Sequence, residues 1–156
     1  MYYKKILIRM AEQSDCLDIL SWRNNKISSK MSSNTKIISL NSHKYWFFQV
    51  LNDNNKVMYI GQLDNQKVGV CRFEYNKLQL VSEVSINMNP KLRGKGYGKL
   101  FLKLSIVKYI KEHKNDIIAK VRLDNLPSIK IFTYTGFKVT KKKDNMVYFR
   151  KSIKVI

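Results

Sequence analysis

The chain has 156 residues, 44% of them hydrophobic, and 30 basic against 11 acidic side chains give it a formal net charge of +19. This size and hydrophobic content predict one folded domain over residues 1–156 and exclude a disordered chain. No apolar run reaches the roughly 18–20 residues that span a bilayer, and Arg9 interrupts the N-terminal run before it could form a signal peptide. We therefore expect a cytoplasmic protein with no membrane association.

The first third of the sequence alternates strand, helix and loop patterns. Apolar spacing predicts a strand over 6–10, followed by a helix that Ser14 caps and that ends near 24–25. A loop or short helix over 28–41 comes next. The following helix is capped by Asn41 or Ser42 and ends at 52–55. Three strands follow, over 57–63, 68–75 and 78–88, and turns at 64–66 and 76–77 make them an antiparallel meander.

The second half returns to helix and strand in alternation. A helix over 96–113 carries two apolar stripes, one with Leu102 and Ile106 and one with Leu100 and Val107, so we expect it to be packed on two sides. A strand over 117–123, a short helix capped by Asn125 that ends at Gly136, and strands over 137–142 and 146–153 complete the chain.

The most informative segment lies where the strand over 78–88 passes through a glycine-rich turn into the long helix. Glycines at 94, 96 and 98 permit a tight turn that brings backbone N–H groups close to a ligand. The helix N-terminus adds unpaired N–H donors and a partial positive charge, which together suit a pyrophosphate, and Arg93, Lys95 and Lys99 strengthen the field. A purely structural turn is the alternative.

Other phosphate-binding loops do not fit this turn. The triphosphatase pattern Gly-x-x-x-x-Gly-Lys-Ser/Thr is missing from the sequence. The dinucleotide fingerprint has a different glycine spacing and opens a βαβ unit, whereas this turn follows an antiparallel meander.

Two motifs at a characteristic separation resemble one known family. The run Arg93-Gly94-Lys95-Gly96-Tyr97-Gly98 is similar to the Arg/Gln-x-x-Gly-x-Gly/Ala signature of the GNAT acetyltransferases, the general-control N-acetyltransferase superfamily. The second motif, Asn125-x-x-Ser128-x-x-x-Phe132-x-x-x-Gly136-Phe137, resembles the pattern that this family carries after its fifth strand. The resemblance implies an α/β (α+β) fold: a mixed, mostly antiparallel seven-stranded sheet, splayed between strands 4 and 5 and flanked by about four helices.

The resemblance also implies that acetyl-CoA is the co-substrate and that no metal is needed. The backbone of the fourth strand would pair with the pantetheine arm as an added strand, and the glycine turn would hold the pyrophosphate. The residues implied in cofactor binding are Ile86, Met88, Arg93, Gly94, Lys95, Gly96, Tyr97, Gly98, Lys99, Asn125, Ser128 and Phe132.

The expected reaction is direct attack of an amine on the acetyl thioester. Glu83 is the candidate general base because it lies three residues before Ile86 on the strand that delivers the acetyl group. An ion pair between Glu83 and Arg72 is the alternative. A backbone N–H near 86–88 is the expected donor to the oxyanion.

Phe132 stands where many family members carry a tyrosine that protonates the leaving thiolate. Phenylalanine cannot donate a proton, and Tyr134 would lie on a different face of the helix. A thiol pKa near 8.5 makes departure as thiolate feasible near neutral pH, so we predict no dedicated acid from this helix.

The acceptor is expected to contact the N-terminal helices. A Trp-Arg-Asn segment, a Met and a His-x-x-Trp-Phe segment resemble the GNAT enzymes that acetylate a nucleotide-linked amino sugar in pseudaminic-acid synthesis. Aromatic rings could stack on the base and cations could bind the diphosphate, although Trp22 and Trp46 could equally be core residues and His43 a surface or capping residue. The candidate substrate-binding residues are Trp22, Arg23, Asn24, Met31, His43, Trp46 and Arg72.

Other partners remain open at this stage. A protein N-terminal acetyltransferase of the ribosomal-protein type, or an enzyme for small amines or antibiotics, would use the same cofactor site. A nucleic-acid-binding module without catalysis is a further alternative, supported by the charge and by a basic run near the C-terminus: Lys138, Lys141, Lys142, Lys143, Arg150 and Lys151. No aromatic-interleaved basic motif or helix-turn-helix signature accompanies this charge, which could be compositional, so we expect no nucleic-acid partner. Edge strands could pair two subunits into a homodimer.

Overall fold

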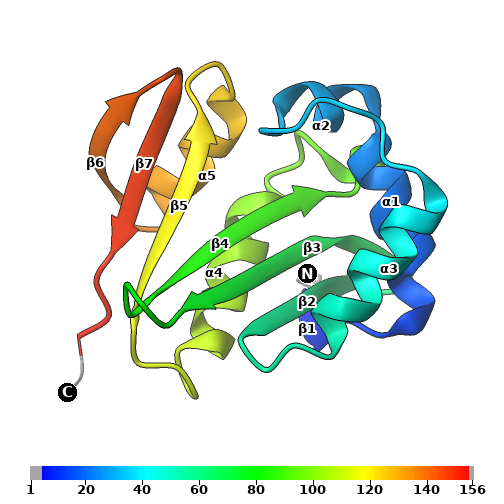
Figure 1. The fold of residues 1–156 in the computed structure, drawn as a ribbon, viewed down its shortest axis with the longest axis horizontal. Helices are drawn as coiled ribbons and strands as arrows, with labels where there is room; N and C mark the ends of the chain where they lie inside the picture. Colours follow the sequence, from blue (N-terminus) through cyan, green and yellow to red (C-terminus); the bar gives the residue numbers. More distant parts are fainter. Residues whose placement is uncertain (1–4, 155–156) are drawn as a thin grey trace.

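The fold is built on one seven-stranded sheet in the order β1-β2-β3-β4-β5-β7-β6. In this computed structural model, which describes residues 5–154, only the β4–β5 pair is parallel and the other five pairs are antiparallel (Figure 1). The mixed, mostly antiparallel sheet expected from the sequence is thus confirmed. The strands are β1 (Leu7–Met10), β2 (Lys56–Leu63), β3 (Gln66–Asn76), β4 (Val81–Met88), β5 (Asp116–Arg122), β6 (Lys138–Lys143) and β7 (Met146–Lys151).

Five α-helices and two 3₁₀ turns in the described part of the chain cover the sheet unequally. In Figure 1, α1–α3 gather over the β1–β4 half, whereas α4 and α5 lie behind the sheet. No helix is drawn in front of β5, β7 and β6. The helices are α1 (Cys16–Asn24), α2 (Lys26–Met31), α3 (Leu40–Leu51), α4 (Tyr97–Tyr109) and α5 (Leu126–Tyr134), and the 3₁₀ turns are η1 (Gln13–Asp15) and η2 (Pro90–Leu92).

Two apolar clusters fill the space between helices and sheet. The larger one packs α4 and α5 against the back of the sheet around Phe73, Phe101 and Phe149, each at most 1% exposed. The smaller one packs α1 and α3 against β2 and β3 around Phe47 and Ile60. The middle parts of β2 and β3 are therefore buried on both faces.

Two of the predicted helix caps are wrong. Ser14 lies inside η1, and its hydroxyl donates to the Glu12 carboxylate instead of capping α1. The cap of α3 is Ser39, whose Oγ accepts from the backbone N–H of Ser42 at 3.3 Å. Several Ser and Asn residues precede each helix, so composition alone does not select the capping residue.

Two further boundaries, and the packing of α4, differ from the prediction. The strand β4 begins at Val81, because residues 77–80 form the turn and Leu78 is 97% exposed. The helix α4 ends at Tyr109 instead of His113. It is also packed on one side only: Leu102 and Ile106 are buried, whereas the stripe of Leu100 and Val107 is exposed.

Candidate active site

The strands β4 and β5 are joined at one end and apart at the other. Their parallel pairing covers only three residue pairs and ends at Glu83, which pairs with Ile118. On its other side, β4 stays paired with β3 as far as Met88. In the described chain, the β4 edge from 84 to 88 consequently has no strand beside it, and Figure 1 shows β4 and β5 diverging from this joint. An edge of this kind offers free backbone groups to an extended ligand.

The glycine turn at the open end of β4 serves two separate purposes. Gly94 and Gly96 have φ values of +74° and +82°, a region that other residues enter only with strain, and a Cβ at either position would meet no atom within 4 Å. Gly98 has no such φ, but a Cβ there would lie 2.7 Å from the Ile131 Cδ1 atom of α5. Two glycines thus shape an open turn at the N-terminus of α4, and the third lets α4 approach α5.

The Arg93 side chain faces α2 and not the open turn. Its guanidinium donates to Asn25 Oδ1 and Asn87 Oδ1, both at 3.3 Å, to the Met88 carbonyl at 3.2 Å, and to Ser28 Oγ. Burial lowers the Arg93 pKa from its ordinary value. Arg93 therefore joins the start of α2 to the end of β4, a role that the sequence did not reveal.

The two lysines of the turn differ from each other. Lys95 is exposed, whereas the Lys99 ammonium lies over the Tyr134 ring, 4.7 Å from its centroid. Tyr97 is half-buried and packs against the larger core cluster. The positive field that the sequence predicts at this turn comes chiefly from backbone N–H groups and Lys95.

The start of α5 lies directly after β5, at the open end of the divergence. Asn125 caps this helix, as predicted, by accepting from the Ser128 backbone N–H at 3.3 Å. Phe132 is only 3% exposed and packs edge-to-face on Phe137, with ring centroids 5.1 Å apart. Tyr134 is 66% exposed. The two residues hence lie on different faces of α5, as expected, and Phe132 supports the site from inside the core.

Glu83 lies at the joint, directly opposite a second carboxylate. Its cross-strand partner on β3 is Glu74, and paired residues present their side chains on one face of a sheet. Both residues line a surface depression of about 310 Å³ that also includes Lys77. The ion pairs of Glu74 go to Lys56 at 3.5 Å and Arg72 at 3.9 Å. The alternative of an Arg72–Glu83 ion pair is thus not observed, because Arg72 pairs with Glu74.

Four of the predicted acceptor residues have structural roles instead. Trp22 and His43 are 6% and 2% exposed in the α1–α3 interface, where His43 Nε2 bonds the Cys16 carbonyl at 2.8 Å and burial lowers the His43 pKa. The Asn24 amide bonds both backbone groups of Ile38, at 2.8 and 2.9 Å. Arg23 donates to the Asn34 carbonyl. These side chains hold the N-terminal helices and the loop over 32–39 together, and we assign them no substrate contact.

The remaining predicted acceptor residues lie nearer the surface. The Arg72 guanidinium sits 5.2 Å from the centroid of the Trp46 ring, and both side chains are half-buried. Met31 is half-buried at the end of α2. The structure therefore brings Trp46 and Arg72 together beside the Glu74–Glu83 pair.

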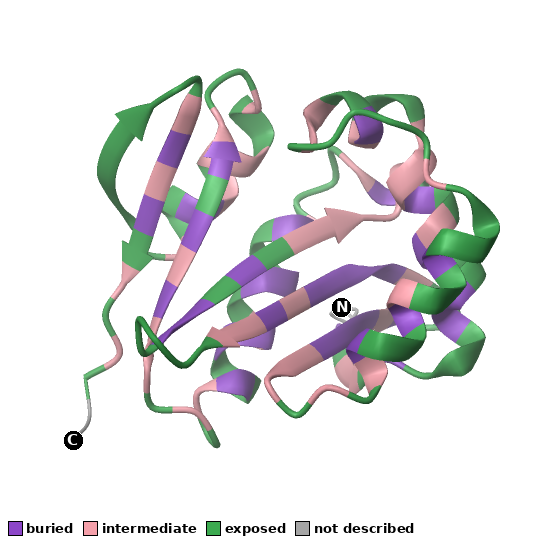
Figure 2. Cartoon of the chain, viewed as in Figure 1, coloured by how far each residue is buried: buried purple, intermediate pink, exposed green. Residues whose placement is uncertain are grey.

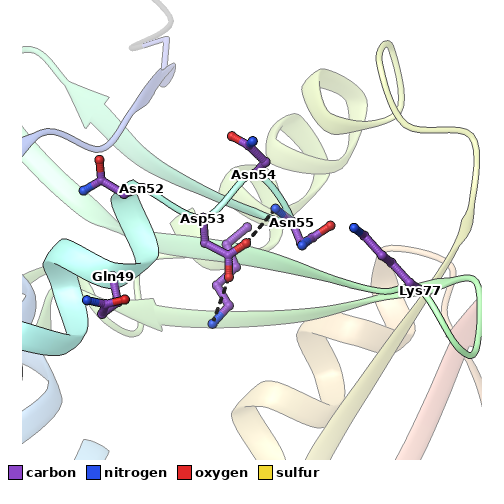
Figure 3. A pocket seen from close by; sticks show the side chains of 7 residues that line it. Gln49, Asn52, Asp53, Asn54, Asn55 and Lys77 are labelled. Carbon is purple, nitrogen blue, oxygen red and sulfur yellow. Dashed lines mark hydrogen bonds and ion pairs between the residues drawn. The ribbon is translucent and has the colours of Figure 1, made fainter.

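A second surface hollow adjoins the Glu74–Glu83 depression and shares Lys77 with it. It measures about 490 Å³ and is bordered by the turn between α3 and β2 (Figure 3). The Asp53 carboxylate there accepts from the Asn55 N–H at 2.9 Å and pairs with Lys56 at 3.5 Å, which are the bonds of a closed turn. In Figure 3, Lys77 extends toward Asn55 from the opposite side. We assign this hollow no function.

Residues 5–154 contain neither a candidate metal site nor a candidate membrane-spanning helix. No three His, Cys, Asp or Glu side chains gather there into a possible metal site. Nor is any helix in that range long and apolar enough to cross a membrane. Cys16 and Cys71 are both buried and unbridged, and burial raises the pKa of the Cys71 thiol to about 12, so it is an inert core residue.

Comparison with known proteins assigns a family to this geometry. Residues 5–138 match the acetyltransferase (GNAT) domain, whereas no curated protein matches the chain.

Among solved structures, a domain from Methanocaldococcus jannaschii is 26% identical, with 96% of this chain and 99% of that chain covered and a TM-score of 0.79. Spermidine N-acetyltransferase from Vibrio cholerae, in complex with CoA and spermine, is 15% identical over 93% and 92% of the two chains (TM-score 0.80). Ribosomal-protein-alanine N-acetyltransferase from Brucella melitensis is 20% identical over 94% and 99% (TM-score 0.77).

The last two likenesses establish the fold alone, since their identities are low. The family match covers most of the sequence, including the diverging strands, the glycine turn and the whole of α5. This chain belongs to the GNAT acetyltransferase family.

Proposed function

We propose that the protein transfers the acetyl group of acetyl-CoA to a primary amine of a small-molecule acceptor. The observation that carries the proposal is the free β4 edge that leads directly into an open, positive-φ turn at the N-terminus of α4. An extended arm with a pyrophosphate at one end matches both features: the arm pairs with the strand, and the pyrophosphate meets the turn.

The residues present fit the coenzyme. The backbone of Ile86 and Met88 would pair with the pantetheine arm, and the N–H groups from Gly94 to Lys99 would hold the pyrophosphate. Asn125 and Ser128, at the start of α5, would form the opposite wall. A side chain at 94 or 96 would meet no protein atom, so the space above the turn is free for phosphate oxygens.

The acceptor side is marked by the Glu74–Glu83 pair. Lys56 and Arg72 balance the charge of Glu74, whereas Glu83 directly opposite has no ion pair within residues 5–154. In a protein of net charge +19, this unbalanced carboxylate favours an amine at this position. Once the amine is bound, Glu83 would accept its proton, directly or through a water, while Glu74 stays ion-paired with Lys56 and Arg72.

The coenzyme supplies an acetyl thioester, and the chain supplies the groups around it. A backbone N–H between Ile86 and Met88 would stabilise the negative charge that develops on the acetyl oxygen. With Phe132 inside the core and Tyr134 on the outer face, we propose that no side chain of α5 protonates the leaving sulfur.

For the acceptor itself, we propose a nucleotide-linked amino sugar as the first candidate. Its support is now limited to Trp46 and Arg72, which lie together beside the acidic pair. A cation and an aromatic ring can bind a diphosphate and a base. The N-terminus of a protein, the alternative from the sequence, would need only the acidic pair.

A thiol-release screen with acetyl-CoA tests the activity and separates these acceptors. The panel contains amino sugars with and without UDP, polyamines, aminoglycosides and short peptides. Thiol release only with the UDP-linked sugars supports the first candidate, and release only with peptides replaces it. If calorimetry detects no binding of acetyl-CoA, the proposed function is wrong.

Replacing Glu83 by glutamine tests the base. The variant Glu83→Gln keeps the size of the side chain, and we expect kcat to fall about 100-fold or more because the proton acceptor is lost. The matched variant Glu74→Gln changes the same charge on the paired residue and should raise KM with little effect on kcat. An equal loss of kcat in both variants would contradict the assignment of Glu83. Calorimetry with acetyl-CoA should give the wild-type affinity for each.

A further inference from the structure

The front face of β5, β7 and β6 is the largest part of the sheet that no helix covers (Figure 1). Alternate residues of β5 and β7, such as Ala119 and Phe149, are buried against α4 and α5, whereas their neighbours are half-buried or exposed, as the alternating colours of Figure 2 show. The strand register places the outward residues of the three strands side by side. We name them the open face: Lys120, Arg122, Lys138, Lys141, Lys143, Met146, Tyr148 and Arg150.

Two lysine ammonium groups make cation–π contacts with a tyrosine at the centre of the open face. Tyr148 on β7 is the cross-strand partner of Lys120 on β5 and of Lys141 on β6. The two ammonium groups lie 5.5 and 4.5 Å from the centroid of its ring, so they are no more than 10 Å apart. Like charges held this close raise the energy of the free protein and lower it once an anion binds between them.

A β-bulge adds the other lysines of β6 to this face. In a regular strand, Lys138 and Lys141 would point to opposite faces because they are three residues apart. The register shift between Val139 and Lys141 removes that difference, so that Lys138, Lys141 and Lys143 pair with Arg150, Tyr148 and Met146. All three lysines consequently lie on the side of Tyr148.

The positive charge of the open face is only partly balanced. Arg150 pairs with Asp116, and Arg122 with Asp124, both at 2.8 Å. The four lysines at 120, 138, 141 and 143 have no carboxylate partner within residues 5–154, and all four are exposed. A ligand for this face therefore carries several negative charges.

Protection of an edge strand is the simplest other explanation for lysines on β6. Charged residues on an edge prevent it from pairing with another sheet. That explanation does not account for Lys120 and Tyr148, which belong to the inner strands β5 and β7. A binding surface accounts for the residues of all three strands.

We propose that the open face binds a single strand of nucleic acid. The six residues of β6 extend about 20 Å, which exceeds the size of one phosphate group and suits a row of them. A flat sheet that combines cations with a half-buried aromatic ring on its outer side is a suitable platform for an unpaired strand, whose phosphates meet the lysines and whose bases meet the ring. A duplex would need an element that enters a groove, and no helix projects from this face.

This binding is separate from acetyl transfer but lies on the same side of the sheet as the acceptor. Glu83, Ile118, Arg150 and Lys138 are successive partners in one row across β4, β5, β7 and β6. Since paired residues share a face, a strand bound on the open face would lie beside the Glu74–Glu83 pair. The residues that bind it are distinct from the glycine turn.

Fluorescence anisotropy with a labelled 12-nucleotide oligouridylate tests the proposal. We expect salt-dependent binding by the wild-type protein and weaker binding of a 12-base-pair duplex. The double variant Lys120→Gln/Lys141→Gln should weaken binding about tenfold and flatten the slope of log affinity against log salt by about 1.4, since each phosphate contact on a single strand contributes about 0.7. Tyr148→Ser should weaken it about fivefold or more, and Tyr148→Phe should retain it.

The matched control is Lys103→Gln/Lys111→Gln. It removes two exposed lysines, one in α4 and one just after it, and gives the protein the same net charge as Lys120→Gln/Lys141→Gln. Less than a twofold effect in this control supports a defined site, whereas an equal loss in both double variants overturns the proposal in favour of general charge. No binding of oligouridylate at low salt, or tighter binding of the duplex, also overturns it. Acetyl-CoA affinity by calorimetry should be the same in every variant, which separates this result from a failure of the proposed function.

Discussion

The two halves of the sheet are built differently. The β1–β4 half carries helices on both faces, with one apolar cluster on each, whereas β5, β7 and β6 carry helices on the back only. The middle parts of β2 and β3 are runs of consecutive buried residues, whereas β5 and β7 alternate between buried and outward positions, as Phe149 and Tyr148 do, and every residue of β6 is exposed. The comparison teaches that stability is concentrated in the first half and on the back, while the front of the second half is free to evolve as a binding surface.

The sharpest test of this difference uses two adjacent residues of β7. Replacing Phe149, which is 1% exposed, by alanine leaves a cavity in the larger core and should lower the free energy of unfolding by about 3–5 kcal/mol. Replacing Tyr148 by serine removes an aromatic ring from the open face and should cost about 1 kcal/mol or less. Urea unfolding followed by circular dichroism measures both. Equal losses would show that the open face is part of the core.

In the two-sided half, the expected large effect is electrostatic. Asp15 is fully buried and accepts from both Arg9 nitrogens at 2.7 and 2.9 Å, from the Glu12 N–H at 2.9 Å, and pairs with Lys67 at 2.9 Å. Burial raises the pKa of this carboxyl, but the hydrogen bonds from Arg9, Glu12 and Lys67 outweigh it and lower the pKa to about 2. The pair ties β1 and β3 to the start of α1.

The pKa of Asp15 is lower in the folded than in the unfolded chain, so its ionised form stabilises the fold. This stabilisation is fully present above about pH 4, where the carboxyl is ionised in both states, and it disappears as the pH falls from about 4 to 2. The shift corresponds to about 2 kcal/mol. We expect Asp15→Asn to be less stable than wild type by at least that amount at pH 7, with the difference shrinking toward pH 2. A difference that does not depend on pH would refute the ion-pair explanation.

The smallest expected effect on stability comes from the turn between the halves. Gly96 has a φ of +82° and open space around it, so Gly96→Ala should cost only the strain of that backbone conformation, about 1 kcal/mol. The same substitution should weaken acetyl-CoA binding fivefold or more, because relief of the strain moves the N–H groups of the turn. Lys91→Ala, at an exposed position of η2 outside the glycine turn, is the control and should retain the affinity. Calorimetry and urea unfolding on both variants would separate the two effects.

The sequence predicted the local geometry of the glycine turn and of the Asn125 cap better than the surroundings of Glu83. Glycine spacing and the Asn125 cap are local signals, and the structure places both where the motifs required. The acceptor side depends on register instead. A turn at 76–77 would place Glu83 opposite Val70, whereas the turn over 77–80 places it opposite Glu74. The length of the turn between β3 and β4 therefore determines whether Glu83 lies opposite Glu74, and no local pattern in the sequence predicts that length.

Aromatic residues near the N-terminal helices misled for a related reason. Trp22 and His43 have the spacing of amphipathic helices, and that spacing does not distinguish a ligand-facing side from a core-facing one. The basic run near the C-terminus is visible in the sequence, but its extension to Lys120 and Tyr148 is not, because these residues join Lys141 only through the pairing of three strands. A search for runs of basic and aromatic residues cannot detect such a surface.

The contacts of Arg93 have a thermodynamic consequence. One guanidinium bonds the start of α2 and the end of β4, the strand proposed to pair with the coenzyme. If the acceptor contacts α2, each ligand touches an element that these hydrogen bonds join. If the coenzyme changes the affinity for the acceptor by some factor, the acceptor must change the affinity for the coenzyme by the same factor, because linkage between two binding equilibria is reciprocal.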